Sequence, residues 1–159
     1  MKIDNTQNIR ETIVNFLQSI NIKVVEQELP NDTFLPGLSL YSNSILMDVE
    51  KLKYPGDLLH EAGHIAVAEK TIRPLIGTPK IADDWPTDGE ELATILWSYA
   101  ACRFLNLDLE IVFHENGYKN DSKWLIEQFN NKNYIGLPLL EWMGLCNSTE
   151  FPTMKKWVR

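Results

Sequence analysis

The chain has few of the residues that would mark it as secreted or membrane-bound. It contains only two cysteines, Cys102 and Cys146, and no run of eighteen apolar residues such as a membrane span needs. Residues 1–5 lead into a polar stretch rather than into the apolar centre of a secretory signal. We therefore expect two reduced, buried thiols and a cytoplasmic protein.

Positive charge is also scarce. Fifteen Lys and Arg residues stand against 22 Asp and Glu residues, which gives a formal net charge of −7. Phosphate contacts need clustered Lys and Arg, and here only Lys155, Lys156 and Arg159 lie close together. We expect neither a nucleic-acid partner nor a membrane partner, and no feature of the chain specifies an oligomeric state.

The composition that remains is that of a globular domain. Hydrophobic residues make up 44% of the chain and charged residues 23%, which are ordinary values for a domain that buries a core. No repeat, low-complexity tract or linker divides the sequence, so we expect one domain over residues 1–159.

The first half of the chain reads as a helix followed by a small sheet. Residues 1–8 are polar and should be frayed, whereas apolar residues recur at helical spacing over 9–20. A strand is expected over 22–29, and the turn at Pro36-Gly37 opens a hairpin with strands near 37–41 and 45–49.

Two long helices should follow the sheet. Asp57 can cap, or complement the charge of, a helix running to about Lys70, and the second helix spans Gly89–Leu105. Between them, residues 71–88 form an irregular connection that is either one wall of a cleft or a solvated acidic loop. Further along we expect a strand over 107–114, helices near 123–129 and 139–143, and a last helical turn from Phe151. This order predicts an α+β fold in which a small antiparallel or mixed sheet packs against two buried helices.

The strongest motif lies in the first of these long helices. His60-Glu61-Ala62-Gly63-His64 follows the pattern H-E-x-x-H. On a helix, His60 and His64 lie about 40° apart and one turn above each other, so both imidazoles can bind one zinc ion. Glu61 points to their flank, where its carboxylate can reach a metal-bound water without being a ligand.

Two interpretations of this motif compete. The surrounding residues are helix formers with apolar positions, so the helix should be largely buried. Two histidines and a carboxylate on a buried helix are costly unless something binds them, which favours a metal site. The alternative is a core histidine pair satisfied by hydrogen bonds.

A catalytic zinc site usually needs a third protein ligand. Glu91 lies 27 residues after His64 (91 − 64) and Glu90 lies 26 residues after it, both in the first turn of the second long helix. Helical periodicity does not separate the two, although we favour Glu91. His114 or an aspartate is a further candidate, and an ordinary charge at a helix start explains either glutamate without a metal.

The motif and its downstream acid resemble the ImmA/IrrE group of zinc metallopeptidases. The resemblance rests on residues 57–64 and on an acid about 27 residues later that heads an Ala- and aromatic-rich helix. It covers roughly residues 10–105. It implies a zincin-like metallohydrolase domain in which His60, His64 and Glu91 bind zinc and Glu61 is the general base.

The chain also departs from that group. It shows no helix-turn-helix region, and the position four residues after the third ligand, which often holds an acid, holds Thr94 or Ile95. The partners that orient the two histidines should then come from an aspartate or a backbone carbonyl. The candidate aspartates are Asp48, Asp84 and Asp88.

One further histidine and three aromatic residues are candidates for either a functional or a structural role. His114 ends the expected strand, with Tyr118 close by, and either could donate a hydrogen bond to an oxyanion. A surface histidine at a strand end is the simpler reading of His114. Trp97 and Tyr99 lie on a helix that is apolar throughout, so we expect both in the core.

The leading hypothesis is a zinc-dependent hydrolase, most readily a metallopeptidase acting on a peptide or protein substrate. Zn²⁺ would acidify a water and polarise the scissile carbonyl, and Glu61 would take the proton and pass it on. One alternative is a regulatory or interaction module in which zinc joins two helices without turnover. The other is a metal-free interaction protein with an accidental motif.

Overall fold

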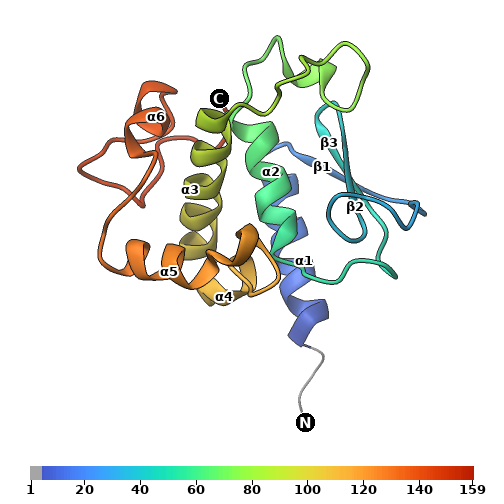
Figure 1. Cartoon of the computed structure of the whole chain (residues 1–159), viewed down its shortest axis with the longest axis horizontal. Coiled ribbons are helices and arrows are strands. Elements are labelled where there is room, and N and C mark those ends of the chain that lie inside the picture. The colour runs from blue at the N-terminus through green and yellow to red at the C-terminus, as the bar shows by residue number, and fades with distance from the viewer. Residues whose placement is uncertain (1–4) are drawn as a thin grey trace.

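The computed structural model describes residues 5–159 (Figure 1). One helix comes first, three short strands follow it, and the rest of the described chain contains helices and loops. The elements are α1 Asn5–Ser19, β1 Lys23–Glu26, β2 Leu38–Tyr41, β3 Ser44–Met47, α2 Asp57–Val67, η1 Arg73–Leu75, α3 Asp88–Phe104, α4 Leu109–Val112, η2 Tyr118–Asn120, α5 Ser122–Asn130 and α6 Leu137–Trp142.

The three strands form a mixed sheet at one side of the molecule. Their order is β1-β3-β2, with β3 parallel to β1 and antiparallel to β2. Ile45 and Met47 alternate with half-buried residues along β3 and are themselves buried, as a strand with one face on a core requires. Helices and a small sheet together make an α+β fold, which confirms the fold class predicted from the sequence.

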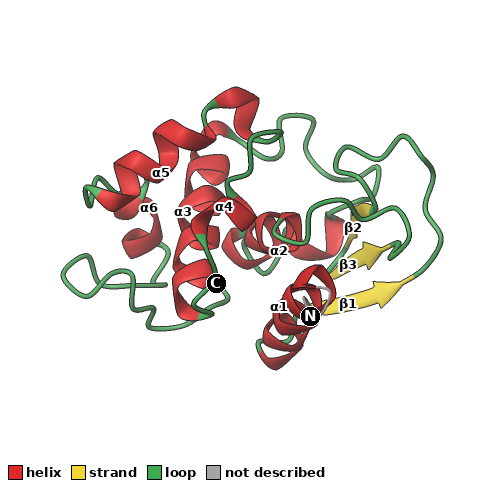
Figure 2. Cartoon of the chain, turned by 90° about the horizontal axis from the view of Figure 1, so that it is seen from below, coloured by secondary structure: helices red, strands yellow, loops and turns green. Residues whose placement is uncertain are grey.

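Helices α2 and α3 lie side by side at the centre, between the sheet and the helices α4, α5 and α6 (Figures 1 and 2). Nine of the eleven residues of α2 are buried, because it is covered by the sheet and α1 as well as by α3. Thr87 starts α3 through a capping box with Glu90, in which each side chain bonds to the other residue's backbone N–H.

Helices α2 and α3 come into tight contact at Gly63, inside the motif. A Cβ atom at this position would lie 2.9 Å from Cγ2 of Thr94 and 3.1 Å from its carbonyl oxygen. The glycine therefore lets the two helices touch beside the motif histidines.

Replacing this glycine should disturb that contact. We expect Gly63→Ala to lower the free energy of unfolding by about 1–3 kcal/mol, the usual cost of overpacking, in chemical denaturation. Gly89→Ala is the matched control, because the nearest atom to a Cβ there is Cδ1 of Leu139 at 3.8 Å. Equal stability of the two variants would contradict the tight contact at Gly63.

Three local predictions are wrong. Residues 107–114 form α4 and a following loop instead of a strand, since their alternation of apolar residues also suits a short helix with Val112 and Phe113 buried. Residues 151–159 contain no helix: Trp157 and Arg159 bond through their backbones to Trp97 and Ala66, which holds this segment irregular. Residues 5–8 are helical rather than frayed, and residues 1–4 lie outside the described part of the chain.

The remaining elements agree with the predicted ones to within a few residues. Cys102 and Cys146 are free and buried, and Trp97 and Tyr99 belong to the core, as predicted. Among residues 5–159, no helix has the length and apolar character that crossing a bilayer requires.

Candidate metal centre

The contact between α2 and α3 brings three potential ligands together. Nε2 of His60 lies 3.3 Å from Oε1 of Glu91, and Nε2 of His64 lies 3.3 Å from Oε2 of the same carboxylate. The two Nε2 atoms are 3.1 Å apart. Both imidazoles are largely buried, whereas 39% of the Glu91 side chain is exposed.

Glu90 points elsewhere. Its Oε1 lies 3.0 Å from Oγ1 of Thr87 and 3.4 Å from the Thr87 backbone nitrogen, within the capping box. Of the two glutamates at the head of α3, it is therefore Glu91 that faces both histidines.

The spacing of these atoms fits a metal ion. Two ligands about 2.0–2.1 Å from a tetrahedrally coordinated zinc lie about 3.3 Å from each other. The three separations between His60, His64 and Glu91 are 3.1–3.3 Å. Imidazole nitrogens and carboxylate oxygens that face one another at this distance repel unless a proton or a metal cation lies between them.

Glu61 lies beside this group. One carboxylate oxygen of Glu61 and one nitrogen each of His60 and His64 lie within 4.8 Å of one another, so these three residues could hold a metal ion. The Glu91 separations match those expected between two ligands of one zinc. Glu91 is therefore a candidate ligand together with the two histidines, and Glu61 is a further acid at the same site.

Two hydroxyl groups orient the histidine rings. Nδ1 of His60 lies 3.1 Å from Oη of Tyr118, and Nδ1 of His64 lies 3.3 Å from Oγ1 of Thr94. If each Nδ1–H donates to its hydroxyl oxygen, both Nε2 atoms keep a free lone pair toward Glu91.

The partners expected from the sequence are therefore wrong. Asp48 instead accepts hydrogen bonds from the backbone nitrogens of Leu29 and Glu50. Asp84 and Asp88 are exposed. The position four residues after Glu91 holds Ile95, and the hydroxyl of Thr94, one residue earlier, makes the hydrogen bond to the His64 ring. Tyr118 could not be assigned to His60 from the sequence, because 58 residues separate them (118 − 60).

These hydroxyls should affect metal affinity. We expect Tyr118→Phe and Thr94→Val each to weaken zinc binding by about 10-fold, the lower end of the usual effect of such outer partners. Competition with a chromophoric chelator measures this. Tyr41→Phe, at an exposed edge-strand position, is the control and should leave the affinity unchanged.

Burial and neighbouring charges shift the pKa values of these groups in the metal-free protein. Burial, and then the nearby His60, lower the pKa of His64 to about 4, so its imidazole is neutral at pH 7. Burial lowers the pKa of His60 too, but its hydrogen bond to Glu91 and the acids around it outweigh this and raise the pKa overall. Burial raises the pKa of Glu61 to about 7, a value suited to taking up and releasing a proton.

A second buried pair lies next to the centre. Oδ1 of Asp57, in the first turn of α2, is 2.7 Å from Nε2 of His114, whose ring stacks on Tyr54 at 3.8 Å between centroids. Asp57 thus makes no cap hydrogen bond and instead fixes the loop after α4. His114 follows helix α4 and not a strand. It is not a free surface histidine either, because only 12% of its side chain is exposed and it pairs with Asp57. No pattern in the sequence indicates this pairing.

One cavity adjoins the centre, and a second lies near it at the other end of α2. One, of about 310 Å³, has His60, Glu91 and Tyr118 in its lining. The other, of about 400 Å³, is lined in part by residues of the 71–88 connection, including Trp85, whose ring lies 5.7 Å from that of His64. The 71–88 connection therefore forms one wall of a cleft. Of the two structures expected for it, a cleft wall and a solvated acidic loop, this is the first.

Comparison with known proteins adds no relative: no family model, curated protein or solved structure matches this chain.

Proposed function

We propose that this protein is a zinc-dependent hydrolase that cleaves peptide bonds. The observation that carries the proposal is the close approach of His60 Nε2, His64 Nε2 and the two carboxylate oxygens of Glu91, at separations of 3.1–3.3 Å. Two histidines and one carboxylate are a ligand set of catalytic zinc sites, which keep a further position open. The exposed part of Glu91 and the adjoining 310 Å³ cavity give such a position access to a substrate.

The residues around this site would have two roles, metal binding and proton transfer. His60, His64 and Glu91 would hold the ion, which in such sites supplies Lewis acidity toward a water and a carbonyl oxygen. Glu61 would accept a proton from the attacking water and deliver it to the departing amine. Its burial supports this role, since a carboxylate with a pKa near 7 can take up a proton and give it back at neutral pH. The resemblance of residues 57–64 to the ImmA/IrrE group supports the choice of a peptide as substrate.

Turnover that depends on zinc tests the proposal. The protein, stripped with a chelator and then reloaded, would be incubated with a mixture of peptides that is analysed by mass spectrometry. We expect new termini only with zinc, and none after chelation. Full zinc loading with no cleavage of any peptide would contradict the proposal.

A non-catalytic zinc module is the second candidate. The position of the proposed ligands on two different helices favours it. His60 and His64 belong to α2 and Glu91 belongs to α3, and these two central helices pack against each other. An ion held there would join the two helices and stabilise the fold by about 2.7 kcal/mol at a free concentration 100 times Kd. A rise in Tm on zinc addition without any turnover would select this candidate.

A further inference from the structure

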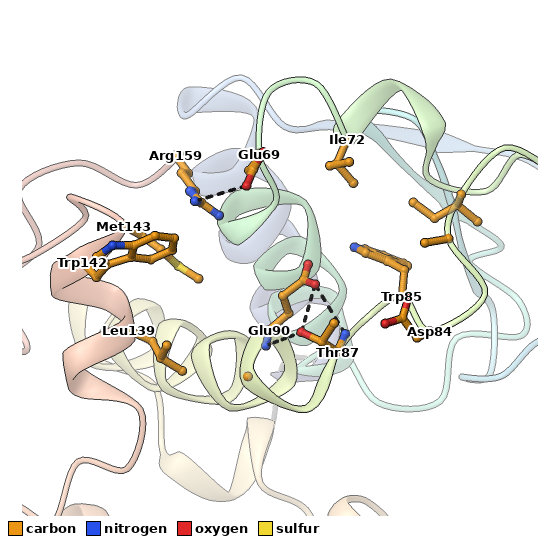
Figure 3. A pocket seen from close by; sticks show the side chains of 13 residues that line it. Glu69, Ile72, Asp84, Trp85, Thr87, Glu90, Leu139, Trp142, Met143 and Arg159 are labelled. Atoms are coloured by element: carbon orange, nitrogen blue, oxygen red, sulfur yellow. Dashed lines mark hydrogen bonds and ion pairs between the residues drawn. The ribbon is translucent and has the colours of Figure 1, made fainter.

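The 400 Å³ cavity lies beyond the metal centre, at the carboxyl end of α2 (Figure 3). On one side are Leu139, Trp142 and Met143 from α6 and its end, and on the other are Ile72 and Trp85 from the 71–88 connection. This wall is mostly apolar. Of the charged residues at its edge, Arg159 pairs with Glu69 at 3.7 Å, Glu90 is bound in the capping box of Thr87, and Asp84 is exposed.

Trp85 connects this cavity to the metal centre. Its ring lines the cavity and lies 5.7 Å from the ring of His64, so Trp85 stands between the cavity and this proposed metal ligand. In Figure 3 the indole nitrogen is directed into the hollow.

The same nitrogen has an unmet hydrogen bond. Nε1 of Trp85 is buried and has no acceptor anywhere in residues 5–159, whereas Trp97, also buried, donates its Nε1–H to the carbonyl of Trp157 at 2.9 Å. Buried indole N–H groups normally find an acceptor. A ligand in this cavity could supply that acceptor once the Trp85 ring turns or the atoms that cover Nε1 move aside.

We propose that this cavity is a substrate subsite: Trp85 donates its indole N–H to a backbone carbonyl of the peptide, and the apolar wall receives a bulky apolar side chain of the same peptide. The inference rests on the proposed peptidase function and adds the substrate class, namely peptides with a large apolar residue near the scissile bond. Apolar rather than charged side chains fit because Leu139, Met143 and Ile72 offer no polar partner to a charged group. Trp85 acts here as a positioning residue.

The indole signals of the protein provide a direct test. The Glu61→Gln protein, loaded with zinc and labelled with ¹⁵N-tryptophan, should give one indole N–H signal for each of its five tryptophans. Comparison with a Trp85→Phe variant identifies the Trp85 signal. The probes are capped alanine heptapeptides carrying one Leu, Phe or Asp at the central position. Nε1 of Trp85 is covered by neighbouring atoms in the free protein. A peptide carbonyl can bind it only if the indole ring or those atoms move, and either movement shifts the Trp85 indole N–H signal.

We expect the Leu and Phe peptides to shift the Trp85 signal downfield with saturation, while the signal of Trp97 stays in place. Replacing the central Leu by Ala should weaken binding about 10-fold, and Asp should weaken it further. Trp85→Phe should weaken binding of the Leu peptide about 3- to 10-fold, the usual effect of one hydrogen bond, whereas Trp124→Phe, at an exposed position of α5, should not.

Each outcome separates this inference from the function on which it rests. If peptides are cleaved by the wild-type protein but never move the Trp85 signal, or bind equally with Leu, Ala and Asp, the subsite is overturned. If the Leu peptide binds with the expected shift and no peptide is cleaved, the subsite is supported and the peptidase function fails.

Discussion

Glu61→Gln should abolish turnover while leaving zinc in place. The amide keeps the shape of the carboxylate but cannot accept a proton, and removing a general base costs about 10²–10⁴-fold in rate. The proposed ligands are His60, His64 and Glu91, which lie 3.1–3.3 Å from one another, and Glu61 lies beside them, within 4.8 Å of the histidine nitrogens. Zinc content should therefore stay at the wild-type level, as measured by elemental analysis beside a peptide-cleavage assay.

Glu127→Gln, on α5, is the matched control and should keep both activity and zinc. Loss of zinc together with activity in Glu61→Gln would mean that Glu61 is itself a ligand. Unchanged activity in this variant would show that the protein uses another base.

Glu91→Ala should remove zinc from the protein. Its carboxylate is the only charged group within 3.3 Å of both Nε2 atoms among the described ion pairs, and without it two imidazoles remain to hold the ion. The affinity should fall by more than the roughly 10–100-fold typical of outer partners. Titration with a competing chelator measures the loss.

Glu90→Ala, one residue earlier, separates ligation from helix stability. This variant loses the capping box, which is worth about 0.3–1.5 kcal/mol, and should bind zinc as the wild-type protein does. A similar loss of zinc in both variants would show that the head of α3, rather than the Glu91 carboxylate, matters for binding.

Much of this arrangement could be predicted from the sequence. The spacing of His60 and His64 on an apolar helix predicted that their rings meet, because four residues complete about one helical turn. The buried character of α3 could be read from its continuous apolar stretch after an acidic first turn. Periodicity could not choose between Glu90 and Glu91. The structure places Glu91 toward the histidines and Glu90 in the cap. The Thr87-x-x-Glu90 capping signature is a signal in the sequence that could have distinguished them, but our prediction did not use it.

The contacts that could not be predicted are those between distant, short segments. Tyr118 reaches His60 from the loop before α5, and Asp57 reaches His114 from the start of α2. Neither pair shares a helix or a strand, so no periodicity records it. Helix α4 was predicted as a strand for a related reason. It is only four residues long, and the pattern of apolar residues in so short a segment is compatible with a helix or a strand, so its conformation depends on the packing around it.

The zinc content of the wild-type protein, purified without chelator and analysed for metals, tests the central claim most directly. The arrangement of His60, His64 and Glu91 predicts one zinc ion per chain, absent from His64→Ala protein prepared in parallel. A folded wild-type protein with no zinc, and with no uptake when zinc is supplied, would contradict the metal centre and with it the proposed hydrolase.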